Sequence, residues 1–194
     1  YDQNTYQYND SNKNTSSKLI IGFAGKITES KRIDFLIDTI DNLKIRDKIK
    51  LIIVGFNDND EYCRSLKQLA QKINFEVEFR PFASSDELVE FYNYIDLAIY
   101  PGGISITTIE ASGCGTPVII YKSINGLEER VSYDRGNLFE TKDELIVNIN
   151  KYFKLVEEKK VDNYYISKKT KELFSWEKIS KDYLKLYKQA INEN

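Results

Sequence analysis

The sequence contains no histidine and no methionine. Histidine is the commonest general acid–base residue, so any proton transfer by this chain would depend on Asp, Glu, Lys or Tyr, or on groups outside it. The two cysteines, Cys63 and Cys114, lie far apart and form no C-x-x-C pair, which disfavours a metal cluster or a disulfide framework. Because no initiator methionine is present, we expect the chain to be a fragment or a processed product.

Charge and hydropathy argue against two further classes of protein. Lys and Arg number 28 against 30 Asp and Glu, so no basic excess points to nucleic acid. No apolar run is as long as a membrane span, and no signal-peptide pattern opens the chain. We therefore expect a cytoplasmic protein without a transmembrane segment, with a peripheral position at the inner face of a membrane as the alternative.

Apolar runs alternate with segments of helical periodicity along most of the 194 residues. Strands are expected at 19–24, 50–54, 76–80, 97–100, 117–121 and 137–139, with helices between them and only helices after 143. This alternation predicts an α/β fold, a doubly wound parallel sheet of the Rossmann-like kind. We interpret residues 19–194 as one such domain, and residues 1–18, which show no sustained period, as a linker or surface extension.

Several helix ends carry a recognisable signal. Ser30 is expected to cap the first helix, Ser84 or Ser85 the third, and Thr141 the helix that begins near Asp143. The last helix has an apolar stripe, which we expect to be core rather than interface; it comprises Trp176, Ile179, Tyr183, Leu184 and Tyr187.

The stretch 95–121 carries the strongest indication of a ligand site. A strand runs into Pro101-Gly102-Gly103 and then into a helix, whose first amides, about Ser105 to Thr107, lack partners within the helix. Glycines allow the backbone to approach a ligand, and a helix N-terminus favours phosphate. Glu110, one turn further along, can reach a hydroxyl group. We interpret the stretch as a nucleoside diphosphate site with a carboxylate for the ribose.

An ordinary strand–glycine–helix turn is the alternative, because the stronger fingerprint G-x-G-x-x-G is missing. The position of other residues favours the ligand site. Three of the expected strands are followed by candidate residues, namely Lys26, the turn at Gly55 and the segment from Arg80 to Phe82. Lys31 lies at the expected start of the first helix. Ligands of doubly wound sheets bind outside the carboxyl ends of the strands, so all of these residues are expected at one rim. Considered alone, Lys26 or Lys31 would be interpreted as an ordinary solvated charge on the surface.

Asp58-Asn59-Asp60 superficially resembles a metal-binding Asp-x-Asp motif. It lies in a turn with no third ligand evident, so we predict neither a metal nor any other cofactor.

Two segments form recognisable motifs: Ile109-Glu110-Ala111 with Gly113-Cys114-Gly115-Thr116-Pro117-Val118-Ile119, and residues 25–31. The first is similar to Leu-Glu-Ala-Met-Ala-Cys-Gly-Thr-Pro-Val-Ile, and the second to the Gly-Arg and Lys element, of the group 1 (family 4) retaining glycosyltransferases, which have the two-lobed GT-B fold. The chain resembles the C-terminal, nucleotide-sugar-binding lobe of that family. The resemblance implies roles for Lys26, Lys31 and Glu110 at the reacting donor. It also implies a surrounding donor site formed by Gly25, Arg80, Phe82, Gly102, Gly103, Ile104, Ser105, Ile106 and Thr107.

Two departures from the family pattern affect this reading. The family's Glu-x7-Glu motif requires a carboxylate eight residues before Glu110, and that residue is Gly102. Lys26 stands where arginine is usual, which keeps the charge but loses the bidentate fork. Donor binding is therefore better supported than turnover.

The resemblance implies metal-independent transfer of a sugar, with retention, from a nucleoside diphosphate sugar, a UDP-sugar being favoured. The acceptor, a sugar, lipid-linked or protein group in surface polysaccharide or glycoconjugate synthesis, would bind through an N-terminal lobe that this chain lacks. We expect the chain alone to bind nucleotide without transferase activity. Two alternatives remain. The first is a non-catalytic nucleotide-sugar-binding module, which the glycine at position 102 suggests. The second is a sugar-nucleotide epimerase of the same fold, or another doubly wound binding domain.

Overall fold

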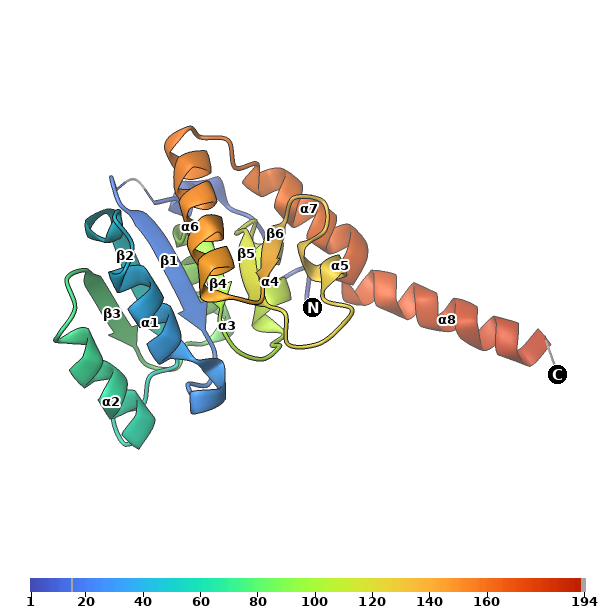
Figure 1. Ribbon diagram of the computed structural model, residues 1–194. Helices are drawn as coiled ribbons and strands as arrows, with labels where there is room; N and C mark the ends of the chain where they lie inside the picture. The colour runs from blue at the N-terminus through green and yellow to red at the C-terminus, as the bar shows by residue number, and fades with distance from the viewer. Residues whose placement is uncertain (15, 193–194) are drawn as a thin grey trace.

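The computed structural model describes residues 1–14 and 16–192 (Figure 1). Within them, six parallel strands form one sheet in the order β3-β2-β1-β4-β5-β6. The strands are β1 (Leu19–Ala24), β2 (Ile49–Val54), β3 (Glu76–Arg80), β4 (Leu97–Tyr100), β5 (Val118–Tyr121) and β6 (Gly136–Phe139). The chain winds outward from β1 to β3 and then returns to place β4 on the other side of β1. The sheet order therefore reverses between β1 and β4, which is where doubly wound sheets bind ligands.

Helices cover both faces of the sheet. α1 (Ile33–Asp41) contacts α2 (Glu61–Ala70) and α6 (Lys142–Glu157) on the face toward the viewer in Figure 1. α3 (Ser85–Tyr94), α4 (Thr107–Gly113) and α7 (Asn163–Phe174) pack on the other face. The remaining elements are α5 (Glu128–Val131), α8 (Trp176–Asn192) and the 3-10 turns η1 (Asp10–Asn12), η2 (Glu29–Lys31) and η3 (Arg46–Lys48). The predicted Rossmann-like fold is confirmed.

The central strands are buried on both sides, as their unbroken apolar sequence predicts. All six residues of β1 and all four of β4 are buried, and the side chains of Ile21 and Ile99 are fully excluded from solvent. Burying one such side chain stabilises the fold by roughly 1.5–3 kcal/mol. The core is thus centred on the two strands whose carboxyl ends flank the crevice.

Most of the predicted helix caps are present, but Ser30 does not cap α1. Ser84 forms a capping box with Glu87, and the Thr141 side chain accepts a hydrogen bond from the backbone of Glu144. Ser30 lies inside η2, and Arg32, with a left-handed φ of 54°, precedes α1. A 3-10 turn is inserted between strand and helix, and its i→i+3 hydrogen bonds have no hydrophobic period that would reveal it in the sequence.

The first fourteen residues lie against the domain. Tyr1 and Tyr6 are buried, and the backbone of Tyr1 accepts a hydrogen bond from the first amide of α8 at 3.2 Å. Asn93, fully buried in α3, accepts a hydrogen bond from the amide of Asn9 at 2.6 Å and donates to the carbonyl of Gln7 at 2.9 Å. Buried tyrosine rings and one asparagine side chain fix this segment, and neither leaves a periodic pattern in its polar sequence.

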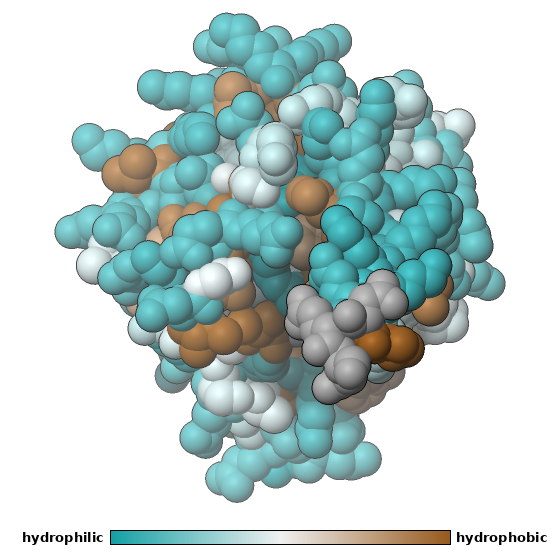
Figure 2. Space-filling view, turned by 90° about the vertical axis from the view of Figure 1, so that its right-hand side faces the viewer, coloured by the Kyte–Doolittle hydropathy of each residue, from teal (hydrophilic) through white to brown (hydrophobic). Residues whose placement is uncertain are grey.

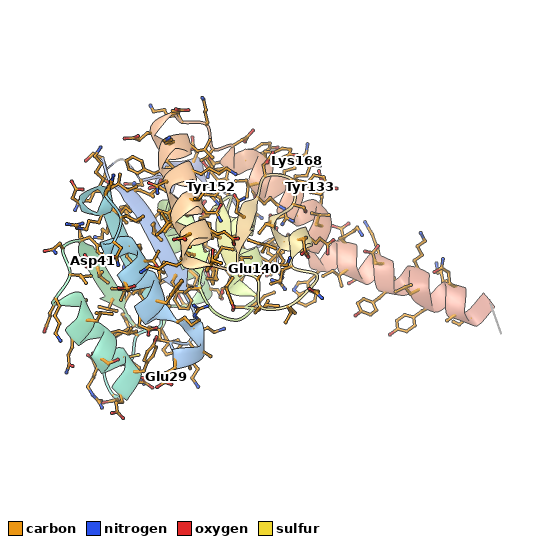
Figure 3. The ribbon with its side chains drawn as sticks, viewed as in Figure 1. Glu29, Asp41, Tyr133, Glu140, Tyr152 and Lys168 are labelled. Atoms are coloured by element: carbon orange, nitrogen blue, oxygen red, sulfur yellow. The ribbon has the colours of Figure 1, made fainter. Side chains whose placement is uncertain are left out.

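The apolar stripe of α8 is exposed, contrary to the core position expected for it. Trp176, Tyr183, Leu184 and Tyr187 are each more than half accessible to solvent. α8 extends beyond the body of the domain in Figure 1, and in Figure 3 its side chains project away from the sheet. The hydrophobic groups on this side of the molecule form small patches in a mainly hydrophilic surface (Figure 2). Amphipathic spacing predicted the helix correctly, but it does not show whether anything packs on the apolar side.

Replacing Asn93 by alanine is expected to destabilise the domain. The substitution empties the buried position of the Asn93 side chain and leaves the amide of Asn9 and the carbonyl of Gln7 without their partner at a part-buried contact, so we predict a loss of about 1–3 kcal/mol in the free energy of unfolding. Urea denaturation measures it. Asn42→Ala, which removes an exposed side chain bonded to the carbonyl of Asp38, is the control and should cost less than about 0.5 kcal/mol. Equal losses in the two variants would contradict the assigned role.

Candidate functional site

The carboxyl ends of β1, β2, β3 and β4 form one rim, at the lower end of the molecule in Figure 3, where Glu29 is labelled. Gly25, directly after β1, donates to the carbonyl of Val54 at 3.2 Å, and Phe56 donates to the carbonyl of Arg80 at 2.9 Å. These hydrogen bonds align the ends of the three strands. The predicted site residues Gly25, Arg80 and the turn after β4 consequently lie on the same edge of the sheet.

The glycine turn after β4 packs directly on the backbone of η2. A Cβ atom added to Gly102 would lie 2.1 Å from the carbonyl oxygen of Ser30, so any side chain at this position would force the backbone apart. Gly103 has a φ of 64°, and a Cβ atom there would lie 3.3 Å from the Nζ atom of Lys31. Lys31 is therefore brought to the turn as predicted from the sequence. A carboxylate side chain at position 102 would not fit the present backbone.

Five consecutive backbone amides at this turn have no hydrogen-bond acceptor within the described part of the chain; they belong to Gly102, Gly103, Ile104, Ser105 and Ile106. The amide of Thr107, at the start of α4, makes only a long contact of 3.4 Å with the hydroxyl of Ser105. Unpaired N–H groups in succession form a concave site for anions, and the start of a helix adds its positive dipole end. The sequence predicted free amides from about Ser105 onward, whereas in the structure they begin at Gly102, three residues closer to β4.

Glu110 lies one turn into α4 and is half-buried. Burial raises the pKa of its carboxyl group, and the neighbouring hydroxyl of Tyr6 partly offsets that increase. Tyr6 also faces Ser85, at the start of α3. A carboxylate in this setting accepts hydrogen bonds more readily from hydroxyl groups than it would in bulk water.

A cavity of about 580 Å³ lies beside the end of β3. Arg80, Phe82 and Phe91 line it, and the ring of Phe82 is 63% exposed. The Nε atom of Arg80 donates to the carboxylate of Glu78 at 2.6 Å, which fixes the guanidinium at the cavity wall. A flat aromatic ring and an apolar floor suit a nucleobase, and the cavity adjoins the rim that carries the free amides.

Lys26 follows Gly25 on the same rim, and its side chain is exposed. Among the described residues it forms no ion pair, and the same holds for Lys31. Both ammonium groups are therefore available to a ligand. The structure brings Lys31 to the glycine turn, whereas Lys26 points from the neighbouring strand end into solvent.

Two arginines beside the turn were not identified from the sequence. The Nη1 atom of Arg32 donates to the carbonyl of Pro101 at 3.4 Å, and its guanidinium stacks on the rings of Phe35 and Tyr121 at 4.3 and 4.7 Å. The Nη1 atom of Arg130, in α5, donates to the carbonyl of Ser105 at 3.2 Å. Hydrogen bonds from arginine to backbone carbonyls follow no sequence pattern, and only the position of Arg32 next to Lys31 could have suggested one of them.

The Asp-x-Asp sequence has structural roles. Asp60 caps α2 by accepting from the amide of Cys63, and Asp58 pairs with Lys67 at 2.9 Å. Within the described residues, no three acidic, histidine or cysteine side chains come together as metal ligands. Metal-independent chemistry stays a prediction.

Comparison with known proteins identifies the family. The model of the family described as glycosyl transferases group 1 matches residues 6–172. The chain belongs to the group 1 glycosyl transferases. Its sequence is 27% identical over 188 residues to an uncharacterized glycosyltransferase of Methanocaldococcus jannaschii, a match that covers 90% of this chain and 45% of the relative. The chain spans about half the length of the curated relatives it matches.

Solved structures of other proteins share the fold of this group 1 domain. Sucrose-phosphate synthase from Thermosynechococcus elongatus superposes with a TM-score of 0.81 at 19% identity, over 100% of this chain and 52% of that one. Anabaena HepE in complex with UDP-glucose superposes with a TM-score of 0.77 at 19% identity, over 97% of this chain and 56% of that one. The Rossmann-like sheet with C-terminal helices is thus one lobe of a GT-B fold. None of the helices described here has the length and hydropathy needed to cross a membrane.

The buried carboxyl of Glu110 should make stability depend on pH. Its pKa in the folded state lies above the ordinary value of 4.5, so the folded state holds the proton more tightly than the unfolded state. The free energy of unfolding contributed by this group is therefore largest below pH 4.5 and is lost as the pH rises through the folded pKa. Glu110→Gln should gain stability relative to the wild type as the pH rises through this range, measured by thermal unfolding. Glu29→Gln, at an exposed rim position, is the control. A pH-independent difference for Glu110→Gln would contradict the burial.

Proposed function

We propose that this domain is the donor-binding lobe of a retaining, family 4 glycosyltransferase, and that it holds the diphosphate of a nucleotide sugar at the turn between β4 and α4. The run of free amides from Gly102 to Ile106, with Lys31 beside it, is the observation that carries the proposal. Both supply positive charge at the same turn, where a diphosphate would replace the hydrogen bonds to water. Glu110 would accept hydrogen bonds from the ribose hydroxyls, and the cavity at Phe82 would hold the base.

In sugar transfer, negative charge grows on the departing diphosphate. The free amides are fixed donors that stabilise this charge without reorganising, and the ammonium groups of Lys26 and Lys31 add positive charge beside them. Each charge-assisted hydrogen bond contributes roughly 1.5–3 kcal/mol, so three or four support about micromolar to millimolar binding after the cost of association. The acceptor would bind through a second lobe, and catalysis would take place between the lobes.

A UDP-sugar is the favoured donor, because HepE, with the same fold, was crystallised with UDP-glucose. The acceptor class, a sugar, lipid-linked or protein group in polysaccharide or glycoconjugate synthesis, is part of the same proposal. The proposal includes a cytoplasmic location, with a peripheral position at the inner face of a membrane as the alternative.

A non-catalytic nucleotide-sugar-binding module is the second candidate. The carboxylate eight residues before Glu110 is replaced by Gly102, and the backbone of Ser30 occupies the space that a side chain would need. Both candidates require the same donor site and differ only in turnover by the complete protein.

Calorimetry with UDP, GDP and ADP tests the site. We expect the wild type to bind one of them, and Lys31→Ala and Glu110→Ala to weaken that binding by about tenfold or more, because each removes a charged partner. Lys26→Ala should weaken it less, since its ammonium is solvated. Lys72→Ala, in the exposed turn before β3, is the control and should leave the affinity unchanged. Unchanged affinity in all three site variants would eliminate this site.

A further inference from the structure

Arg32 and Arg130 approach the β4–α4 turn from two distant parts of the chain and contact it at its two ends. Arg32 precedes α1 and donates to the carbonyl of Pro101, the first residue of the turn. Arg130 comes from α5 and donates to the carbonyl of Ser105 at 3.2 Å and to the Oγ1 atom of Thr108 at 2.7 Å. The free amides lie between these two contacts. The turn itself contains two glycines, so its own sequence does little to fix its conformation.

Both arginine side chains are held by contacts with neighbouring residues, and neither pairs with a carboxylate among the described residues. The guanidinium of Arg32 contacts the rings of both Phe35 and Tyr121, and Arg130 is half-buried. In the described part of the chain, neither guanidinium forms an ion pair. Arg32 also adopts a left-handed φ of 54°, a conformation that glycine would adopt without strain. Strained residues of this kind concentrate at functional sites.

The geometry of the peptide bond links these contacts to the ligand. In a planar trans peptide, the carbonyl of one residue and the N–H of the next point in opposite directions. Because the carbonyl of Pro101 faces Arg32, the N–H of Gly102 points away from Arg32. Because the carbonyl of Ser105 faces Arg130, the N–H of Ile106 points away from Arg130. The carbonyl of Ser105 also accepts hydrogen bonds from the N–H and the Oγ1 atom of Thr108, at 3.3 and 2.9 Å. Arg32 therefore helps to set the direction of the first of the five free amides, and Arg130, together with Thr108, that of the last.

We propose that Arg32 and Arg130 are positioning residues for the donor diphosphate: they bind the carbonyls of Pro101 and Ser105 and thereby aim the free amides of the turn at the phosphates. This inference rests on the proposed function of the turn and adds two residues to it. Their unpaired charges also make the potential at the turn more positive, which favours an anionic ligand.

The test compares a diphosphate with its nucleoside in four variants of the full chain: Arg32→Gly, Arg130→Met, Arg130→Lys and Arg46→Met. Arg32→Gly removes the guanidinium and at the same time relieves the left-handed strain, so it is expected to fold. Arg46→Met is the matched control, because the Nη1 atom of Arg46 donates to the carbonyl of Asp41 at 3.4 Å, away from the rim. The probes are UDP and uridine, or the diphosphate that the wild type binds best with its nucleoside, measured by calorimetry alongside thermal unfolding.

We expect Arg32→Gly and Arg130→Met each to weaken UDP binding by about tenfold and to change uridine binding by less than about twofold, because only the diphosphate contacts the aimed amides. Arg130→Lys should recover part of the loss, and Arg46→Met should change neither affinity. UDP affinity within twofold of the wild type in both variants would overturn the inference. A parallel loss of UDP and uridine binding would also overturn it, because it would show general disruption. No binding of UDP, GDP or ADP by the wild type would instead refute the proposed function.

Discussion

The contact between the glycine turn after β4 and the backbone of η2 is the constraint on which the rim depends. Gly102 approaches the carbonyl of Ser30 so closely that no side chain fits between them. This approach brings Lys31 to Gly103 and leaves the following amides without partners in the described chain. It also requires the reversal of strand order, because only adjacent β1 and β4 can place the segments that follow them in contact. Such a site suits an anionic ligand, because the unpaired amides and the ammonium groups otherwise bind only water.

The sequence predicted the strands and the sheet class because buried parallel strands are continuous apolar runs. β1, β2 and β4 were recognisable on this basis alone. The errors arose where local pattern and tertiary packing disagree. Ser30 has the chemistry of a cap, but it lies in a 3-10 turn, and Arg32 occupies the position before α1. The stripe of α8 has the spacing of a buried face, yet nothing in the described chain covers it. Whether an amphipathic helix is covered depends on its surroundings, which its own sequence does not specify.

The placement of the candidate site was predictable to the level of strand ends. Four of the predicted positions lie at or just after the carboxyl ends of strands: Gly25, Lys26, Arg80 and the turn from Gly102. Lys31 ends the 3-10 turn between β1 and α1, so the common edge of all five followed from topology. Three features required coordinates: the steric block at Gly102, the length of the free-amide run, and the contacts of Arg32 and Arg130 with backbone carbonyls. Each depends on backbone groups, which every residue carries and which residue type therefore cannot reveal.

The central claim is that the free amides of the β4–α4 turn bind the diphosphate of a nucleotide. Amide chemical shifts of the isotopically labelled chain, recorded by NMR during titration with UDP and separately with uridine, test it most directly. The account predicts that UDP shifts the amides of Gly102 to Ile106 strongly, whereas uridine mainly shifts residues around the cavity at Phe82. The largest UDP-induced shifts at the opposite edge of the sheet, around Asn14 and Asp96, with the turn unaffected, would contradict it.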